Sequence, residues 1–141
     1  MGAEGDGVQF ETLGSRVLEF KGFDTFPKPD LVENVVLTSD EVTALCPVTG
    51  QPDWYTVEVA YQPRGLCLES KCFKLYLQSF RQKGLFCEAL ASDICLELAG
   101  VLNPHVIEVR IVQKPRGGVT IEPVARWWAC VREDGREAAG G

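Results

Sequence analysis

The chain has 141 residues, a length that suits one domain and excludes two full catalytic domains. Hydrophobic residues make up 45% and charged residues 24% of it, a balance that excludes disorder over most of the chain. With 20 acidic and 14 basic residues the formal net charge is −6, so we expect no direct binding of nucleic acid. No stretch is apolar and long enough for a membrane helix, and residues 1–7 do not resemble a signal peptide. We therefore expect a cytoplasmic protein without membrane contact.

The cysteine pattern argues against a metal site. The chain has six cysteines and one histidine, and no two cysteines have the Cys-x-x-Cys spacing of a structural zinc site. We therefore expect no bound metal and mostly reduced thiols, as is usual in the cytoplasm.

The first half of the chain is predicted to hold an arm and two strands. Residues 1–30 are mixed in composition and interrupted by prolines, which predicts an extended N-terminal arm. Residues 31–38 are rich in β-branched side chains and predict a strand. Residues 39–53 contain Pro47, Gly50 and Pro52, which favour a loop. Side chains alternate over residues 54–61, and this predicts the second strand.

The second half is predicted to hold two helices and a β-hairpin. Residues 70–82 carry an apolar stripe at helical spacing, and Gly84 suits the left-handed conformation that ends a helix. Residues 86–102 repeat leucine or isoleucine at every fourth position and predict the second helix. A strand over residues 105–113 and a return strand over residues 119–124 flank a tight turn.

The element order is therefore β-β-α-α-β-β, which predicts the α+β class with an antiparallel sheet and both helices on one face. One domain would span residues 31–130, and the charged, then glycine- and alanine-rich tail over residues 131–141 would be disordered. The helices leave the other sheet face uncovered, and the sheet has open edges. We therefore expect a homo-oligomer in which subunits pair through their sheets.

Cys46 and Asp53 are the first candidate site, because they bound a loop with the sequence CPVTGQPD. An ionised cysteine is a strong nucleophile, and a nearby carboxyl group can transfer the proton that an addition reaction requires. A buried loop cysteine and a turn aspartate would give the same pattern, so both interpretations stay open at this point.

A second candidate site lies at the start of the first predicted helix. Lys71 and Lys74 are three residues apart and share a helix face, next to backbone N–H groups that favour anions. The arrangement suits a nucleotide phosphate, and a solvated cationic face also explains it. The G-x-G-x-x-G motif of a Rossmann cofactor site is absent.

Two single residues complete the candidates. Glu88 lies at the start of the second helix, where it can cap backbone N–H groups or bind the N–H donors of a purine-like ring. Arg116 lies in a Pro-Arg-Gly-Gly turn, where it can also be a plain surface residue of the hairpin.

Taken together, these segments resemble a known family. The order and spacing of five motifs are similar to those of the NADPH-dependent 7-cyano-7-deazaguanine reductases. The motifs are CPVTGQPD, ESKCFKLYLQSFRQKG, FCE, IEV and PRGG. These are the QueF-type nitrile reductases, which act in the biosynthesis of queuosine, a modified nucleoside of tRNA. The resemblance covers about residues 32–123. It implies the tunnelling fold (T-fold), whose subunits assemble through their sheets into barrels. For single-domain members it implies a decamer of two pentamers.

The resemblance also implies roles at the first site. Cys46 matches the nucleophile that adds to the nitrile carbon and forms a covalent thioimide. Asp53 matches the acid that protonates the nitrile nitrogen, and Glu88 matches the residue that binds the deazaguanine. The product would be 7-aminomethyl-7-deazaguanine.

At the second site the resemblance implies a cofactor. Glu69, Ser70, Lys71 and Lys74 match the family's signature for the NADPH site, with Glu69 and Ser70 also assigned to the substrate, and the reaction would consume two equivalents of NADPH. Arg116 matches a position that would contact a cofactor phosphate.

One position departs from the family pattern, since Cys87 stands where the family usually has a histidine. That histidine is thought to assist proton transfer, so the role of Cys87 is open. We hypothesise that Cys87 lies near Cys46 and can form a disulfide with it. Two alternatives to the reductase remain: an archaeosine-type enzyme that adds ammonia to the nitrile with the same Cys-Asp pair, and a non-catalytic deazaguanine-binding homologue.

Overall fold

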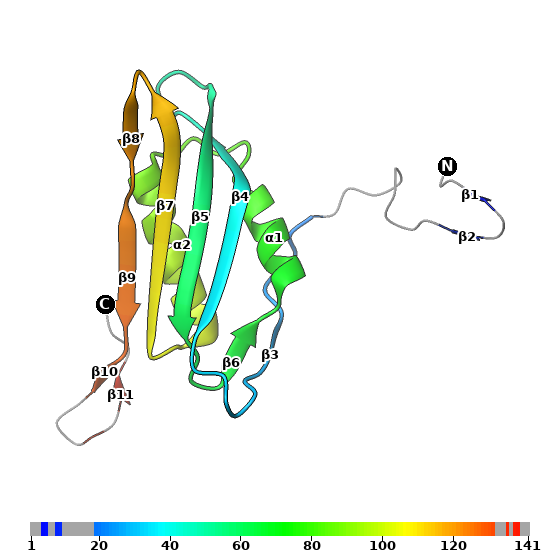
Figure 1. Cartoon of the computed structure of the whole chain (residues 1–141), viewed down its shortest axis with the longest axis vertical. Helices are drawn as coiled ribbons and strands as arrows, with labels where there is room; N and C mark the ends of the chain where they lie inside the picture. Colours follow the sequence, from blue (N-terminus) through cyan, green and yellow to red (C-terminus); the bar gives the residue numbers. More distant parts are fainter. Residues whose placement is uncertain (1–3, 6–7, 10–18, 132–134, 136, 139–141) are drawn as a thin grey trace.

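A long antiparallel sheet forms the framework of the protein. Its strands are β4 (Val35–Leu45), β5 (Pro52–Gln62), β7 (Val106–Arg116), β8 (Val119–Ile121) and β9 (Val124–Trp128). The order is β4-β5-β7-β8, and β9 pairs with β7 further along the same edge. The hairpin predicted near the C-terminus is therefore confirmed, with its return strand divided into β8 and β9 (Figure 1).

The computed structural model describes residues 4–5, 8–9, 19–131, 135 and 137–138. Two helices lie on one side of the sheet, α1 (Ser70–Gln78) and α2 (Cys87–Leu102). In Figure 1, α2 crosses behind β5 and β7, and α1 lies along the outer side of β4. The predicted α+β class, with two helices and an antiparallel sheet, is confirmed.

Short strands extend the fold at its two ends. β3 (Thr25–Pro27) pairs with β6 (Leu66–Leu68) beside the start of α1. Phe20 and Phe23 stack against Tyr76 of α1, so the described part of the predicted arm packs on the domain. The remaining strands form two small pairs: β1 (Glu4–Gly5) with β2 (Val8–Gln9), and β10 (Cys130–Val131) with β11 (Glu137–Ala138). The predicted tail lies mostly outside the described residues.

The alternation in β5 explains why it forms the centre of the sheet. Tyr55, Val57 and Val59 are fully buried against the helices, while Trp54 and the other even-numbered side chains point to the opposite face. Because successive side chains of a strand point to opposite faces, this pattern fixes the register of β5 against both neighbours. Asp53 falls on the buried face for the same reason.

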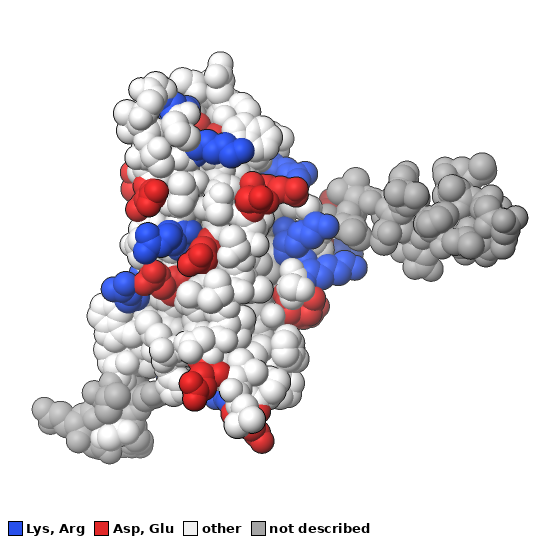
Figure 2. All heavy atoms as spheres, in the orientation of Figure 1, with Lys and Arg blue, Asp and Glu red and all other residues white. Residues whose placement is uncertain are grey.

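The opposite face of the sheet has no covering layer in the described chain. Figure 2 views this face and shows mainly uncharged atoms crossed by clusters of charged side chains. Val36 on β4, Trp54 on β5, and Val124 and Trp128 on β9 are exposed apolar side chains of these strands. In the described residues, no helix is long and apolar enough to span a membrane.

The structure corrects the loop predicted over residues 39–53. β4 continues to Leu45 through an irregularity between Ser39 and Val42, and only the short connection to β5 is a turn. Val42 and Ala44 are buried, so the inward alternation persists after the irregularity. A β-bulge of this kind hides a strand from sequence reasoning, because it shifts the period by a residue.

The end of the first helix also differs from the prediction. α1 stops at Gln78, and the chain then makes tight turns held by hydrogen bonds such as Lys83 N–H to the Phe80 carbonyl, 3.0 Å. Gly84 does not adopt a positive φ. It forms a parallel bridge with Leu45, since Leu45 N–H donates to the Lys83 carbonyl at 2.8 Å and Leu85 N–H donates to the Leu45 carbonyl at 3.1 Å.

Packing of α2 predicts a sharp contrast between two leucines. Leu98 is fully buried in the core and Leu96 is 61% exposed on the same helix. Leu98→Ala should lower the free energy of unfolding by about 2–5 kcal/mol, because it removes buried contacts and leaves a cavity. Leu96→Ala should change it by less than about 0.5 kcal/mol. Urea unfolding of both variants checks this, and equal losses would contradict the packing described.

Candidate functional site

Cys46 lies directly after β4, at the start of the turn that leads to β5. Its N–H donates to the Gln51 carbonyl at 2.7 Å, and its carbonyl accepts from the Gly50 N–H at 2.8 Å. These two bonds close the loop, and Gly50 adopts a φ of +69° that favours glycine. The CPVTGQPD segment thus holds the cysteine backbone at a fixed place beside the end of the sheet.

The surroundings of the Cys46 thiol favour its ionised form. Hydrogen bonds from the Thr49 hydroxyl and from the backbone N–H groups of Thr49 and Val48 lower the pKa of Cys46 to about 7, with a smaller contribution from Arg116. Hydrogen-bond donors aimed at a sulfur stabilise the thiolate. With a pKa of about 7, close to half of the thiol is ionised at neutral pH, so Cys46 has the character of a nucleophile.

Asp53 lies opposite Ala44 in the β4–β5 pair, and its side chain is 5% exposed. Its Oδ1 forms an ion pair with Arg116 Nη1 at 2.9 Å. Its Oδ2 accepts from the Tyr55 hydroxyl at 3.5 Å. Arg116 also makes a smaller contribution to the lowered pKa of Cys46, so this guanidinium pairs with the carboxylate and favours the thiolate.

Cys87 and Glu88 open α2 on the neighbouring side. The Cys87 side chain is buried, and its Sγ lies 3.6 Å from Glu88 Oε2. Burial and the negative charge of Glu88 raise the pKa of Cys87 to about 11, so this thiol keeps its proton at neutral pH. Glu88 itself is exposed.

All six cysteines are described, and all are free thiols. Cys46 and Cys87 are both buried. The hypothesis that they can form a disulfide stays a prediction.

The start of α1 is already capped by the chain itself. The Glu69 carboxylate accepts from the backbone N–H of Lys71 at 2.7 Å and of Cys72 at 2.9 Å. These bonds also lower the pKa of Glu69. Because the helix N–H groups are occupied, a phosphate here would depend on side chains instead.

Side chains around α1 do form a cavity that suits a phosphate-bearing group. A hollow of about 260 Å³ lies between α1 and β4, and Ser70, Lys74 and Arg81 are among its lining residues. Lys71 is exposed next to it on the first turn of α1. The hydroxyl and the two cationic side chains match a phosphate, although Glu41 also lines the hollow and lowers its net positive charge. The volume is smaller than that of a site enclosing a whole dinucleotide.

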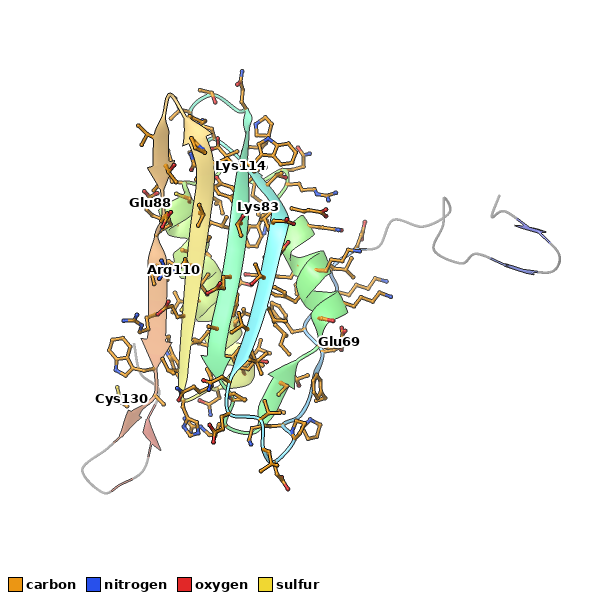
Figure 3. All side chains as sticks on the ribbon, in the orientation of Figure 1. Glu69, Lys83, Glu88, Arg110, Lys114 and Cys130 are labelled. Carbon is orange, nitrogen blue, oxygen red and sulfur yellow. The ribbon has the colours of Figure 1, made fainter. Side chains whose placement is uncertain are left out.

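Within one chain the two candidate sites are separate. Figure 3 shows Glu88 beside the upper end of the sheet and Glu69 at the opposite, lower end near α1. Arg116 pairs with Asp53 and does not line the cavity with Lys74. The sequence reasoning missed Thr49, Tyr55 and Arg81. Thr49 was inside the quoted motif, and Tyr55 lies two residues after Asp53 on the same strand face.

Loss of the Thr49 hydroxyl predicts a measurable change at Cys46. Thr49→Val should raise the pKa of Cys46 above its value of about 7, because the strongest thiolate donor is removed. Alkylation of Cys46 by iodoacetamide at pH 7 should then slow by about three- to fivefold, since thiolate is the reactive form. Peptide mapping of the alkylated protein against pH measures this. Thr43→Val is the matched control and should leave the profile unchanged, and an unshifted profile for Thr49→Val would refute the assignment.

Comparison with known proteins adds the family. A family model described as QueF-like protein matches residues 52–129. The "NADPH-dependent 7-cyano-7-deazaguanine reductase" of Frankia casuarinae is 40% identical over 101 residues, which cover 72% of this chain and 81% of that protein. The protein of the same name from Anaeromyxobacter sp. (strain Fw109-5) is 42% identical over 100 residues, 71% of this chain and 82% of that protein.

A solved structure agrees with this assignment. The apo form of the archaeosine synthase QueF-Like superposes with a TM-score of 0.64 at 29% sequence identity, and covers 67% of this chain and 93% of that chain. The matched family segment begins at β5 and ends after β9, so it contains Asp53, Glu88 and Arg116. By sequence and by fold, the chain belongs to the QueF-like protein family.

Proposed function

We propose that this protein is an NADPH-dependent nitrile reductase that converts 7-cyano-7-deazaguanine to 7-aminomethyl-7-deazaguanine in queuosine biosynthesis. The observation that carries the proposal is a cysteine with a pKa of about 7 that shares Arg116 with a buried aspartate. The names of relatives that are 40% and 42% identical support the same substrate.

In this proposal Cys46 and Asp53 perform the first step together. The thiol proton passes to the Asp53 carboxylate, and the thiolate attacks the nitrile carbon. A C–S bond forms, one π bond of the nitrile breaks, and its nitrogen takes the proton from Asp53. The result is a thioimide with no net gain or loss of protons. Arg116 supports both states, because its positive charge stabilises a thiolate or a carboxylate.

Other residues of the chain would bind the two reactants. The exposed Glu88 carboxylate at the start of α2 suits the N–H donors on the edge of the deazaguanine. Two equivalents of NADPH, bound in turn, would supply the two hydrides that the nitrile requires. Ser70, Lys71, Lys74 and Arg81 would hold the NADPH phosphate groups, while Glu69 orders the first turn of α1 that carries them.

Cys87 would not replace an imidazole as an acid near neutral pH. Its raised pKa means that the thiol gives up its proton less readily than an ordinary cysteine. In this proposal Asp53 therefore transfers the proton, and Cys87 is a buried core residue at the start of α2.

An amidine-forming enzyme is the second candidate, because the archaeosine synthase QueF-Like has a similar fold. Both reactions would begin with the same thioimide. They differ in the second reactant, which is NADPH for the reductase and ammonia for the alternative. The cationic cavity beside α1 favours the reductase, because ammonia needs no phosphate-binding side chains.

The experiment is intact-protein mass spectrometry after addition of 7-cyano-7-deazaguanine. Wild-type protein should gain the mass of the nitrile, and NADPH should remove this adduct as the amine appears. Cys46→Ala should show no adduct, whereas Cys130→Ala is the matched control and should behave as wild type, because Cys130 is an exposed thiol on another strand. An adduct cleared by ammonia and not by NADPH would establish the second candidate, and no adduct would leave a binding role.

We also propose that the protein is a homo-oligomer, as a decamer of two pentamers. The uncovered sheet face and the exposed Val36, Trp54 and Trp128 support association through the sheets. The separation of the Glu69 and Glu88 regions within one chain supports sites completed by neighbouring subunits. The reduced Cys46 that the chemistry needs supports a cytoplasmic location.

Sedimentation equilibrium tests the assembly. The mass should be about ten times the 15.5 kDa of one chain. Trp128→Glu should lower it, because a charge would be buried between subunits. Leu31→Glu, at an exposed side chain that precedes the sheet, is the control and should leave it unchanged. A monomer at all concentrations would refute the proposal.

A further inference from the structure

Tyr55 is a fully buried tyrosine whose hydroxyl points toward the reactive groups. It lies on the inward face of β5, two residues after Asp53, so the two side chains share one face of the strand. Tyr61, further along the same face, is buried as well, but its hydroxyl accepts from the Leu68 N–H at 2.9 Å. The strand therefore carries two inward tyrosines, and only Tyr55 contacts the aspartate.

The contacts of Asp53 show what Tyr55 adds. Arg116 pairs with Oδ1 at 2.9 Å, and the Tyr55 hydroxyl donates to Oδ2 at 3.5 Å. Each carboxylate oxygen thus has its own partner, on two different elements. A carboxylate held at one oxygen can still rotate about its Cβ–Cγ bond, and a second donor at the other oxygen restricts that rotation.

The Tyr55 hydroxyl can act only as a donor here. Burial and the charge of Asp53 raise its pKa well above the usual value for tyrosine, so the phenol stays protonated at every working pH. It cannot take the proton from Cys46 or give one to the substrate at neutral pH. Its effect on a reaction must therefore pass through Asp53.

We propose that Tyr55 is a positioning residue of the nitrile addition: its hydroxyl and Arg116 together orient the Asp53 carboxyl so that one oxygen faces Cys46 and the incoming nitrogen. This rests on the proposed function, because it needs Asp53 to transfer the proton.

The test compares Tyr55→Phe with Tyr61→Phe in single-turnover adduct formation. Each change removes one buried hydroxyl from the same strand face. Tyr55→Phe should slow formation of the Cys46 adduct about tenfold, the low end for a hydrogen bond to a charged group, because 3.5 Å is long. The nitrile concentration that gives half the maximal rate should change less than about twofold, since Tyr55 does not bind the substrate. Tyr61→Phe should match the wild type.

Two further measurements separate positioning from a general structural effect. In an Asp53→Asn background, Tyr55→Phe should cause no additional slowing, because the residue through which it acts is gone. The pH profile of Cys46 alkylation should be unchanged in Tyr55→Phe, since Tyr55 is not among the groups that set the pKa of Cys46. A normal adduct rate in Tyr55→Phe, or an equal slowing with and without the Asp53 carboxylate, would overturn the inference.

A different result would reveal failure of the proposed function. If wild-type protein forms no adduct, the nitrile chemistry is refuted and Tyr55 loses the step assigned to it. Urea unfolding can still test the contact between the Tyr55 hydroxyl and the Asp53 carboxyl. The comparison uses the single variants Tyr55→Phe and Asp53→Asn and the double variant. Non-additive unfolding midpoints would show that the hydroxyl and carboxyl interact, and additive midpoints would show that they do not.

Discussion

The ion pair between Arg116 and Asp53 is the interaction on which the candidate site depends. Asp53 is almost completely buried, and a buried carboxylate without a cationic partner is strongly destabilising. Arg116 comes from the far end of β7, so the pair is available only because β5 and β7 keep one register along eight residue pairs. The same guanidinium stabilises the Cys46 thiolate. The register of the sheet thus determines both the pairing of the buried Asp53 charge and the ionisation of the Cys46 thiol.

Much of the fold could be predicted from the sequence, because it follows local patterns. Residues 87–102 form the second helix as the four-residue spacing of apolar side chains indicated, and β5 follows the alternation over residues 54–61. The extension of β4 to Leu45 could not be predicted, because a bulge and nearby prolines hide its period. Gly84 was misread for a related reason. Its conformation is set by pairing with Leu45, which is distant in sequence.

For the site, the sequence was a better guide to which residues lie together than to the role of each residue. Cys46 and Asp53 do lie together beside Arg116, although Arg116 was assigned to a cofactor phosphate. That assignment and the other roles stay predictions. Tyr55 escaped notice because a tyrosine in a strand usually belongs to the core. Only its place two residues from a buried carboxylate could have indicated more, and burial of that carboxylate is not visible in sequence.

The bridge between Leu45 and Gly84 joins two parts of the site mechanically. Leu45 immediately precedes Cys46, and Gly84 is four residues before Glu88 at the head of α2. Hydrogen bonds from Leu45 to Lys83 and from Leu85 to Leu45 bind these segments together. The backbone beside the Cys46 thiol and the backbone leading into α2 are thus joined by main-chain hydrogen bonds, without any flexible side chain in the link.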